Sequence, residues 1–265
     1  MKKVFFLSGM PRAGNTLLGS ILNQNSNIAT TANSIVFDMI HTIYSFKHDN
    51  PTFLNFPDHK SHDSVIKNII PNYFKDWKQK YIINRDLIDE GRLNLLKKYY
   101  SSDIKVIILW RDLFEVLASF IKWSEQEKDN VIFKNCFTRE EKIDILLDHE
   151  TSNILNSIHC VKQMSKLENI KNVHFISYEN LVNQTEIEIK KLYQFLEIPY
   201  FEHYFTNLDT FSVNGIKYID EKLHGKNLHT IKTKEIKKEE YDYMSYIPQS
   251  CIKKIRKLNY KPEII

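Results

Sequence analysis

The chain has 265 residues, of which 42% are hydrophobic and 26% are charged. These values are typical of globular proteins and exclude an intrinsically disordered or fibrous chain. Domains average roughly 150 residues, but α/β domains commonly reach this length, so we expect one domain over residues 1–265. The formal net charge of +4 is too small for a dedicated nucleic-acid-binding protein. Any anion site must therefore be local, and nucleic acid is not an expected partner.

The cysteines and the apolar runs indicate the compartment. Cys136, Cys160 and Cys251 lie far apart in the sequence and match no metal-binding or redox spacing. No apolar run approaches the roughly 18 residues that span a bilayer, and the first residues become polar too soon for a signal peptide. The sequence predicts a soluble, cytoplasmic protein with reduced thiols.

Predicted strands and helices alternate along the chain. Residues 4–7 form a short apolar run that predicts a strand, which is followed by a glycine-containing loop and by helical spacing from Thr16 to Leu22. The same patterns predict further strands at 81–84, 105–110 and 173–177, and helices at 91–100, 113–123, 143–161, 186–196 and 249–258. This alternation predicts an α/β fold in which a P-loop-type parallel β-sheet is flanked by helices.

Two stretches do not follow the alternation. Residues 47–62 contain two prolines and three histidines among polar residues, which predicts a surface excursion such as a lid over a pocket, or an ordinary loop. Residues 206–247 mix Asp, Lys, Tyr and Gly without a clear period, so mostly irregular structure is expected there.

The loop after the first strand is the most specific motif. Residues 9–16 read Gly-Met-Pro-Arg-Ala-Gly-Asn-Thr, the G-x-x-x-x-G-x-[ST] pattern of a P-loop between a strand and a helix. Gly9 and Gly14 permit a backbone whose N–H groups converge on a phosphate. An ATP-hydrolysing P-loop has Lys at position 15, but this chain has Asn15 there and Arg12 within the loop. The motif therefore predicts a phosphate site other than that of an ordinary ATPase or GTPase; a tight turn without a ligand is the alternative.

This loop carries a resemblance to a known family. The loop resembles the 5′-phosphosulfate loop of sulfotransferases that use 3′-phosphoadenosine 5′-phosphosulfate (PAPS), in particular the tyrosylprotein-type and the bacterial and phage branch. The resemblance assigns the cofactor's 5′ side to these residues: Pro11, Arg12, Ala13, Gly14, Asn15 and Thr16.

Two later segments carry the same resemblance. Residues 106–112, followed by Ser119, resemble the family's 3′-phosphate segment, in which an Arg after a strand (Arg111) and a Ser eight positions later contact the phosphate. Residues 176–182 resemble its adenine segment, in which Tyr178 lies near the base. The resemblance spans about residues 2–199, and 228–232 loosely resemble a late basic loop that closes over the cofactor.

Elementary chemistry agrees with the role of Arg111 and Ser119. An Arg at the carboxyl end of a strand and a Ser two turns into the next helix both reach the crevice where open α/β sheets bind ligands. A guanidinium and a hydroxyl suit a phosphate monoester. The alternatives are a salt bridge of Arg111 with Asp112 or Glu115, and helix packing for Ser119.

The resemblance implies in-line transfer of a sulfuryl group from PAPS to a hydroxyl or amine acceptor, which releases adenosine 3′,5′-bisphosphate (PAP). Arg12 and the loop amides then stabilise the leaving phosphate. Arg85 stands where the tyrosylprotein branch has a lysine, and we expect it to be an electrostatic stabiliser, with a strand-end salt bridge as the alternative. No metal is expected, because the protein's own cations can neutralise the charge.

The general base is the point at which this sequence departs from the family pattern. The branch has a glutamate soon after the P-loop helix, but that position falls on Ala32 and Asn33 here. Asp38 and His41 are three residues apart on a predicted helix and are the first candidates. Asp86 and the histidines of 47–62 are the others.

The sequence is compatible with three functions. The first hypothesis is a PAPS-dependent sulfotransferase; a P-loop small-molecule kinase that uses ATP and a non-catalytic nucleotide-binding protein are the alternatives. The acceptor, a small molecule or a peptide, and the oligomeric state are not determined by the sequence. Aromatic residues between the first helix and the second predicted strand could line an apolar acceptor pocket or pack in the core. They are Phe37, Tyr44, Phe46, Phe53, Phe56, Tyr73 and Trp77.

Overall fold

The computed structural model describes residues 2–148, 152–167, 170–208, 212–218, 228, 236 and 240–263. Within these residues, five strands pair in parallel in the order β2-β3-β1-β4-β5. Their bounds are β1 (Lys3–Gly9), β2 (Ile28–Thr30), β3 (Tyr81–Arg85), β4 (Val106–Trp110) and β5 (Val173–Ser177). A short antiparallel hairpin, β6 (Ser212–Val213) and β7 (Ile216–Lys217), lies outside this sheet. The predicted α/β fold with a parallel sheet is confirmed.

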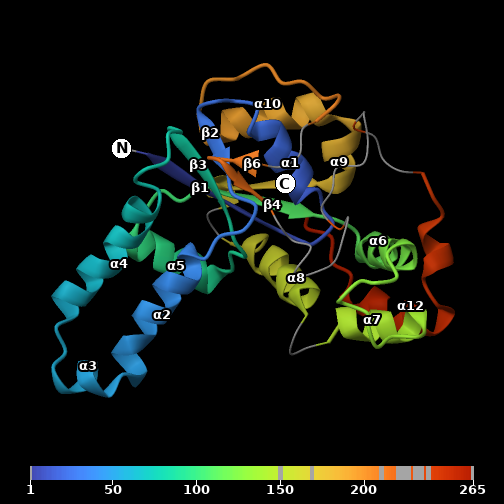
Figure 1. Cartoon of the computed structure of the whole chain (residues 1–265), viewed down its shortest axis with the longest axis horizontal. Coiled ribbons are helices and arrows are strands. Elements are labelled where there is room, and N and C mark those ends of the chain that lie inside the picture. The colour runs from blue at the N-terminus through green and yellow to red at the C-terminus, as the bar shows by residue number, and fades with distance from the viewer. Residues whose placement is uncertain are drawn as a thin grey trace.

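Helices pack on both sides of the sheet, with α1, α9 and α10 on one side and α8 on the other (Figure 1). The bounds of the first six are α1 (Asn15–Leu22), α2 (Val36–Asp49), α3 (Pro51–Asn55), α4 (His59–Tyr73), α5 (Glu90–Tyr99) and α6 (Leu113–Gln126). The later ones are α7 (Arg139–Leu146), α8 (Asn153–Met164), α9 (Tyr178–Asn183), α10 (Thr185–Leu196) and α12 (Gln249–Leu258), with 3-10 turns η1 (Ile170–Asn172) and η2 (Tyr243–Tyr246). None of the helices in the described ranges is long and apolar enough to cross a membrane.

The two central strands explain why the sheet is parallel. Phe5, Phe6 and Leu7 in β1 are buried, as are Ile107 and Ile108 in β4. Consecutive residues of a strand point to opposite faces, so consecutive burial requires that helices cover both faces. The apolar runs in the sequence therefore predicted the layered architecture correctly.

One predicted helix is wrong. The apolar positions of 143–161 predicted a single long helix, but α7 ends at Leu146 and α8 begins at Asn153. The Ser152 hydroxyl caps α8, because it accepts a hydrogen bond from the Leu155 N–H at 3.1 Å. Residues 149–151 are outside the described residues. The apolar period continued through a break that only the cap at Ser152 marks.

The excursion at 47–62 is largely helical, not a loop. It covers the end of α2, all of α3 and the start of α4, and these helices project away from the sheet (Figure 1). Asn50 and Asp58 act as N-caps of α3 and α4. Both the prolines and the polar residues that suggested a loop thus mark helix starts. A role as a lid stays a prediction.

The stretch 206–247 is described only in part. Its described residues include the β6–β7 hairpin, Tyr218, Leu228 and η2. The basic loop expected around 229–232 lies outside the described residues.

Candidate active site

Three strand ends meet at the same edge of the sheet. β1, at the centre, pairs with β3 on one side and with β4 on the other. The chain runs first to β2 and β3 and then crosses to β4, so a topological switch point lies at β1, where open α/β sheets bind ligands. The P-loop follows β1, Arg85 is the last residue of β3, and Arg111 follows β4.

The P-loop has the backbone conformation that its glycines predicted. Gly14 has φ +92°, and Arg12 has φ +61° although it has a side chain. A Cβ at Gly9 would lie 2.6 Å from the Leu109 carbonyl oxygen in β4. A Cβ at Gly14 would lie 2.8 Å from Leu181 Cδ2. The sequence of the loop therefore fits its close packing against β4 and α9.

Asn15 supports the loop from inside. Its side chain is buried, and Nδ2 donates a hydrogen bond to the Met10 carbonyl at 2.8 Å. The residue at the position of the usual P-loop lysine thus ties the two ends of the loop together. Ala13 is buried beside it, whereas Thr16, in the first turn of α1, is half-buried.

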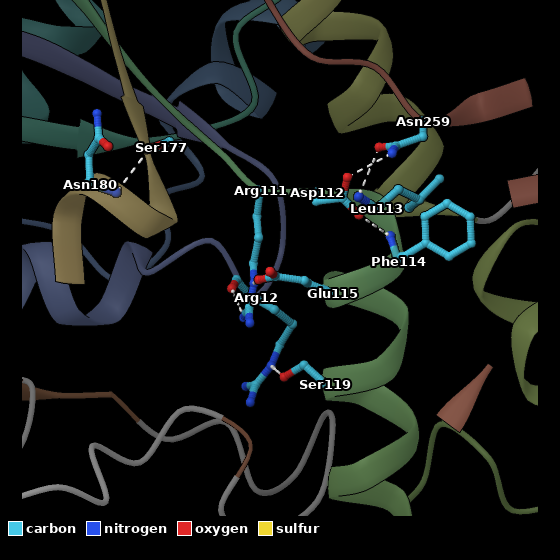
Figure 2. Close-up of polar contacts among 10 residues, drawn as sticks. All are labelled: Arg12, Arg111, Asp112, Leu113, Phe114, Glu115, Ser119, Ser177, Asn180 and Asn259. Atoms are coloured by element: carbon cyan, nitrogen blue, oxygen red, sulfur yellow. Dashed lines mark hydrogen bonds and ion pairs between the residues drawn. The ribbon is translucent and has the colours of Figure 1, made fainter. Parts of the chain in front are cut away.

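Arg12 and Arg111 meet next to α6, as Figure 2 shows. Arg12 Nε donates to the Ser119 hydroxyl at 3.1 Å, and Arg12 Nη1 donates to the Leu228 carbonyl. Arg111 Nη1 donates to the Arg12 carbonyl at 2.9 Å, and its Nε forms an ion pair with Glu115 at 3.0 Å. These contacts join the two arginines and Ser119 into one cationic cluster, although Arg12 and Ser119 are more than a hundred residues apart in the sequence.

Tyr178 completes this cluster. It is the first residue of α9, whose N-cap Ser177 accepts a hydrogen bond from the Asn180 N–H at 3.0 Å (Figure 2). The Arg111 guanidinium lies 3.9 Å from the centre of the Tyr178 ring. A Cβ at Gly14 would lie 3.3 Å from the same ring, so Tyr178 also borders the P-loop. Residues assigned to three separate segments of a nucleotide site are thus in contact.

Of the two salt bridges considered for Arg111, one is present. Arg111 pairs with Glu115, but Asp112 has another role. Its carboxylate caps α6 by accepting from the Phe114 N–H at 2.9 Å, and it accepts from Asn259 Nδ2 at 2.8 Å (Figure 2). The Arg111 side chain is therefore held in place by Glu115 while its guanidinium faces Tyr178.

A cavity of about 500 Å³ lies beside the P-loop. Its lining combines the strand ends, the start of α8 and two residues of the late segment. The described lining residues are Leu7, Gly9, Pro11, Asn33, Ser34, Arg85, Asp86, Leu87, Phe120, Ile132, Ile145, Leu146, Ser152, Asn153, Ile154, Ser157, Tyr218 and Leu228. A mixed polar and apolar cavity next to a phosphate loop suits a small acceptor. The contributions of α8 and Tyr218 have no sequence motif that could have revealed them.

Arg85 is among the residues that line this cavity. Its Nη1 donates to the Ala32 carbonyl at 2.8 Å, and its backbone N–H donates to Thr31 Oγ1 at 2.8 Å. Burial lowers the pKa of Arg85 from its ordinary value. Of the carboxylates that the structure describes, none forms an ion pair with Arg85, so the expected alternative of a strand-end salt bridge is not observed.

The structure gives no geometric support to two expectations about the acceptor side. Asp38 and His41 are exposed on α2, and neither is among the described residues that line the cavity. The aromatic cluster proposed as an acceptor wall belongs to α2, α3, α4 and the turns after α3 and α4, and none of its residues lines the cavity either. The helical period of α2 was correct, but the helix projects away from the switch point. Asp86, weighed only as a further candidate, does line the cavity.

Within the part of the chain that the structure describes, no group of three or more His, Cys, Asp or Glu side chains could hold a metal ion.

Comparisons with known proteins identify the family to which the chain is similar. The sulfotransferase domain family matches residues 2–260. No curated protein matches the chain. The sulfotransferase domain of the Synechococcus PCC 7002 olefin synthase is 13% identical with a TM-score of 0.53, over 88% of each chain.

Two further structures are similar to parts of this chain. Retinol dehydratase, in complex with androsterone and the inactive cofactor PAP, is 12% identical with a TM-score of 0.53, over 96% of this chain and 79% of that one. Mouse sulfotransferase SULT7A1, complexed with PAP, is 16% identical with a TM-score of 0.49, over 76% of this chain but only 59% of the mouse chain. Because the family match extends over nearly the whole sequence, this chain belongs to the sulfotransferase family.

Proposed function

We propose that this protein transfers a sulfuryl group from PAPS to a hydroxyl or amine acceptor by in-line displacement. The convergence of Arg12, Arg111, Ser119 and Tyr178 beside the P-loop carries the proposal. Membership of the sulfotransferase family supports this reaction class. PAP is bound by retinol dehydratase, and we extend that ligand to this chain because the residues assigned to its phosphates and base are in contact here.

Each part of the cofactor has a chemical match. The loop 11–16, at the N-terminus of α1, offers N–H groups and the Thr16 hydroxyl to the 5′-phosphate. Arg111 and Ser119 suit the 3′-phosphate, since a guanidinium and a hydroxyl both donate to a phosphate monoester. The Tyr178 ring offers a surface for the adenine.

The charge that develops in the reaction has fixed cations beside it. As the acceptor oxygen attacks sulfur, the bond from sulfur to the 5′-phosphate oxygen breaks, and PAP leaves with the added charge. Arg12 and the loop amides lie on the leaving side. Arg85 lies on the acceptor side, where it stabilises the transferring group without giving up a proton.

The acceptor binds in the 500 Å³ cavity, which adjoins the P-loop through Gly9 and Pro11. Its size and mixed lining fit a small molecule or one side chain of a peptide. Tyr218, whose hydroxyl accepts from Asn33 Nδ2 at 3.2 Å, and Leu228 also line this cavity. We propose that these two residues help to enclose the acceptor.

We propose that the reaction requires no metal, because arginines surround the leaving group. A kinase using ATP and magnesium is not favoured, since Asn15 is buried and occupied in bracing the loop. We also propose a reducing compartment such as the cytoplasm, because Cys136, Cys160 and Cys251 are free thiols.

Calorimetric titration of PAP without metal tests the cofactor site. We expect PAP to bind, ATP with magnesium not to displace it, and Arg111→Ala to weaken binding at least tenfold, since a charge-assisted hydrogen bond contributes about 1.5–3 kcal/mol. Arg139→Ala is the matched control, because its half-exposed guanidinium also pairs with a glutamate, Glu125, away from the cluster. Binding of ATP with magnesium alone would indicate a kinase. PAP binding without transfer to any hydroxyl or amine would indicate a non-catalytic binding protein.

A further inference from the structure

A carboxylate lies in the same cavity as the P-loop edge. Asp86 directly follows β3, and its backbone N–H donates to the Leu7 carbonyl of β1 at 3.0 Å. Its side chain is 10% exposed and lines the cavity that Gly9, Pro11 and Arg85 also line. Asp86 therefore lines the space proposed for the acceptor, together with two residues of the P-loop.

The two oxygens of this carboxylate differ. Oδ1 accepts from Arg92 Nη1 at 2.9 Å and from the Leu87 N–H at 2.8 Å. Oδ2 is buried and has no hydrogen-bond partner. A buried carboxylate oxygen without a protein partner is uncommon in folded proteins, and it leaves Oδ2 able to accept a hydrogen bond from a ligand. Because χ2 of aspartate is soft, a small rotation would turn this oxygen toward the cavity.

Arg92 fixes the position of Asp86. It is on α5, and its Nη1 also donates to the Leu87 carbonyl at 2.7 Å. Its guanidinium lies 4.5 Å from the centre of the Phe37 ring at the start of α2. These contacts orient the carboxylate before a substrate binds, which is a requirement for efficient proton transfer.

The surroundings of Asp86 also shift the pKa of its carboxyl group. Burial raises the pKa of Asp86 to about 6, Arg92 lowers it, and the negative charge of Asp38 on α2 raises it. The backbone amides of Leu87 and Phe37 favour the charged form, although only the Leu87 amide meets hydrogen-bond geometry. Arg85 is the other charged group in the cavity lining. A base with such a pKa is charged at neutral pH and still accepts a proton readily.

We propose that Asp86 is the general base of the sulfuryl transfer and that Arg92 positions it. This proposal rests on the proposed function. Asp86 takes the proton of the acceptor O–H or N–H while the acceptor atom forms its bond to sulfur. The bond between sulfur and the 5′-phosphate oxygen breaks, PAP leaves with the electron pair, and the proton passes from Asp86 to solvent.

The first test compares Asp86→Asn with the wild type in PAP release from PAPS, with 2-naphthol as the probe acceptor. We expect at least a hundredfold loss of the rate, because general-base catalysis contributes about 10²–10⁴-fold. PAP binding by calorimetry should stay within threefold of the wild type. Asp63→Asn is the matched control, since Asp63 also pairs with a partly buried cation, Lys47, but outside the cavity. Wild-type rates in Asp86→Asn would overturn the proposal, as would loss of PAP binding in that variant.

The second test is the pH profile, which a purely structural role would not move. The rate should rise through the pKa of Asp86, so Asp38→Asn should shift the acid limb to lower pH and Arg92→Gln to higher pH. Arg92→Lys should restore the wild-type limb in part. Carbon-13 NMR titration of the Asp86 carboxyl, assigned with Asp86→Asn, reads the same pKa without an acceptor. An ordinary value, near 4, or equal limbs in all variants would overturn the proposal.

The two proposals fail in different ways. If the wild type does not bind PAP, the proposed function is wrong. If the wild type binds PAP and releases it from PAPS, and Asp86→Asn does so equally well, only the assignment of Asp86 is wrong.

Discussion

The guanidinium of Arg111 lies 3.9 Å from the centre of the Tyr178 ring, and this contact joins the ends of β4 and β5. Glu115, one turn along α6, holds the same guanidinium at 3.0 Å. A cation fixed on an aromatic face presents a charge and a flat ring side by side. Such a pair is suited to a nucleotide whose phosphate and base must be bound together.

Replacing Tyr178 should separate the contribution of the ring from that of the hydroxyl. We expect Tyr178→Leu to weaken PAP binding by about tenfold or more, because stacking contributes about 1–3 kcal/mol per base. Tyr178→Phe should bind PAP nearly as well as the wild type, since it keeps the ring over Arg111. Calorimetry measures both, and equal weakening in the two variants would argue for a hydroxyl contact instead.

The loop position occupied by Asn15 offers a test of the kinase alternative. Asn15→Lys restores the P-loop lysine, but the side chain is buried and Nδ2 bonds the Met10 carbonyl. We expect a lower melting temperature and no ATP hydrolysis with magnesium. The substitution removes the buried amide hydrogen bond and places an ammonium group at a buried position. Asn68→Lys, on the exposed face of α4, is the control for added charge. Phosphate release from ATP by Asn15→Lys would contradict this interpretation.

Two glycines with positive φ allow the cost of close packing in the P-loop to be separated from the cost of the backbone conformation. Gly14 has φ +92°, and a Cβ added there would lie 2.8 Å from Leu181 Cδ2, whereas Gly215 has φ +75° with open space around it. Alanine at either site costs about 1–2 kcal/mol for the backbone conformation. Gly14→Ala should lose about 1–3 kcal/mol more through overpacking. Urea denaturation measures both variants, and equal losses would mean that Leu181 simply moves aside.

His203 should make the fold sensitive to acid. It is buried, and Nε2 bonds the Tyr193 hydroxyl at 2.9 Å. Burial lowers the pKa of His203 to about 4. The unfolded chain therefore takes up a proton near pH 6.5 that the folded chain refuses until about pH 4, so stability falls as the pH drops through this window. With one pKa unit equal to about 1.36 kcal/mol, the loss approaches about 3 kcal/mol.

Denaturation at pH 7 and pH 4.5 tests this prediction. His203→Phe should be somewhat less stable than the wild type at pH 7, because the Tyr193 hydroxyl loses one of its two partners. The variant should lose less stability between the two pH values than the wild type does. His59→Gln, in the exposed first turn of α4, should leave the pH dependence unchanged. The same pH dependence in His203→Phe would show that other groups cause it.

Much of the fold could be predicted from the order of residues. The apolar runs of β1 and β4 and the loop Gly9–Gly14 carry local signals, because burial on two faces and a positive φ restrict the residue types that fit. The break before Ser152, the three-residue strand β2 and the helix α3 could not be predicted in this way. In these short elements, caps and tertiary contacts outweigh periodicity.

The meeting of Arg12, Arg111, Ser119 and Tyr178 could likewise be predicted from the sequence, since they follow strand ends or lie in the first two turns of the next helix, which a parallel sheet brings to one edge. The lining of the cavity was decided only by the tertiary structure. α2 carries Asp38 and His41 away from the cavity, whereas Arg92 and burial set the position and the pKa of Asp86. The direction of a helix, the depth of a carboxylate and the charges around it depend on contacts between distant residues, which no local pattern records.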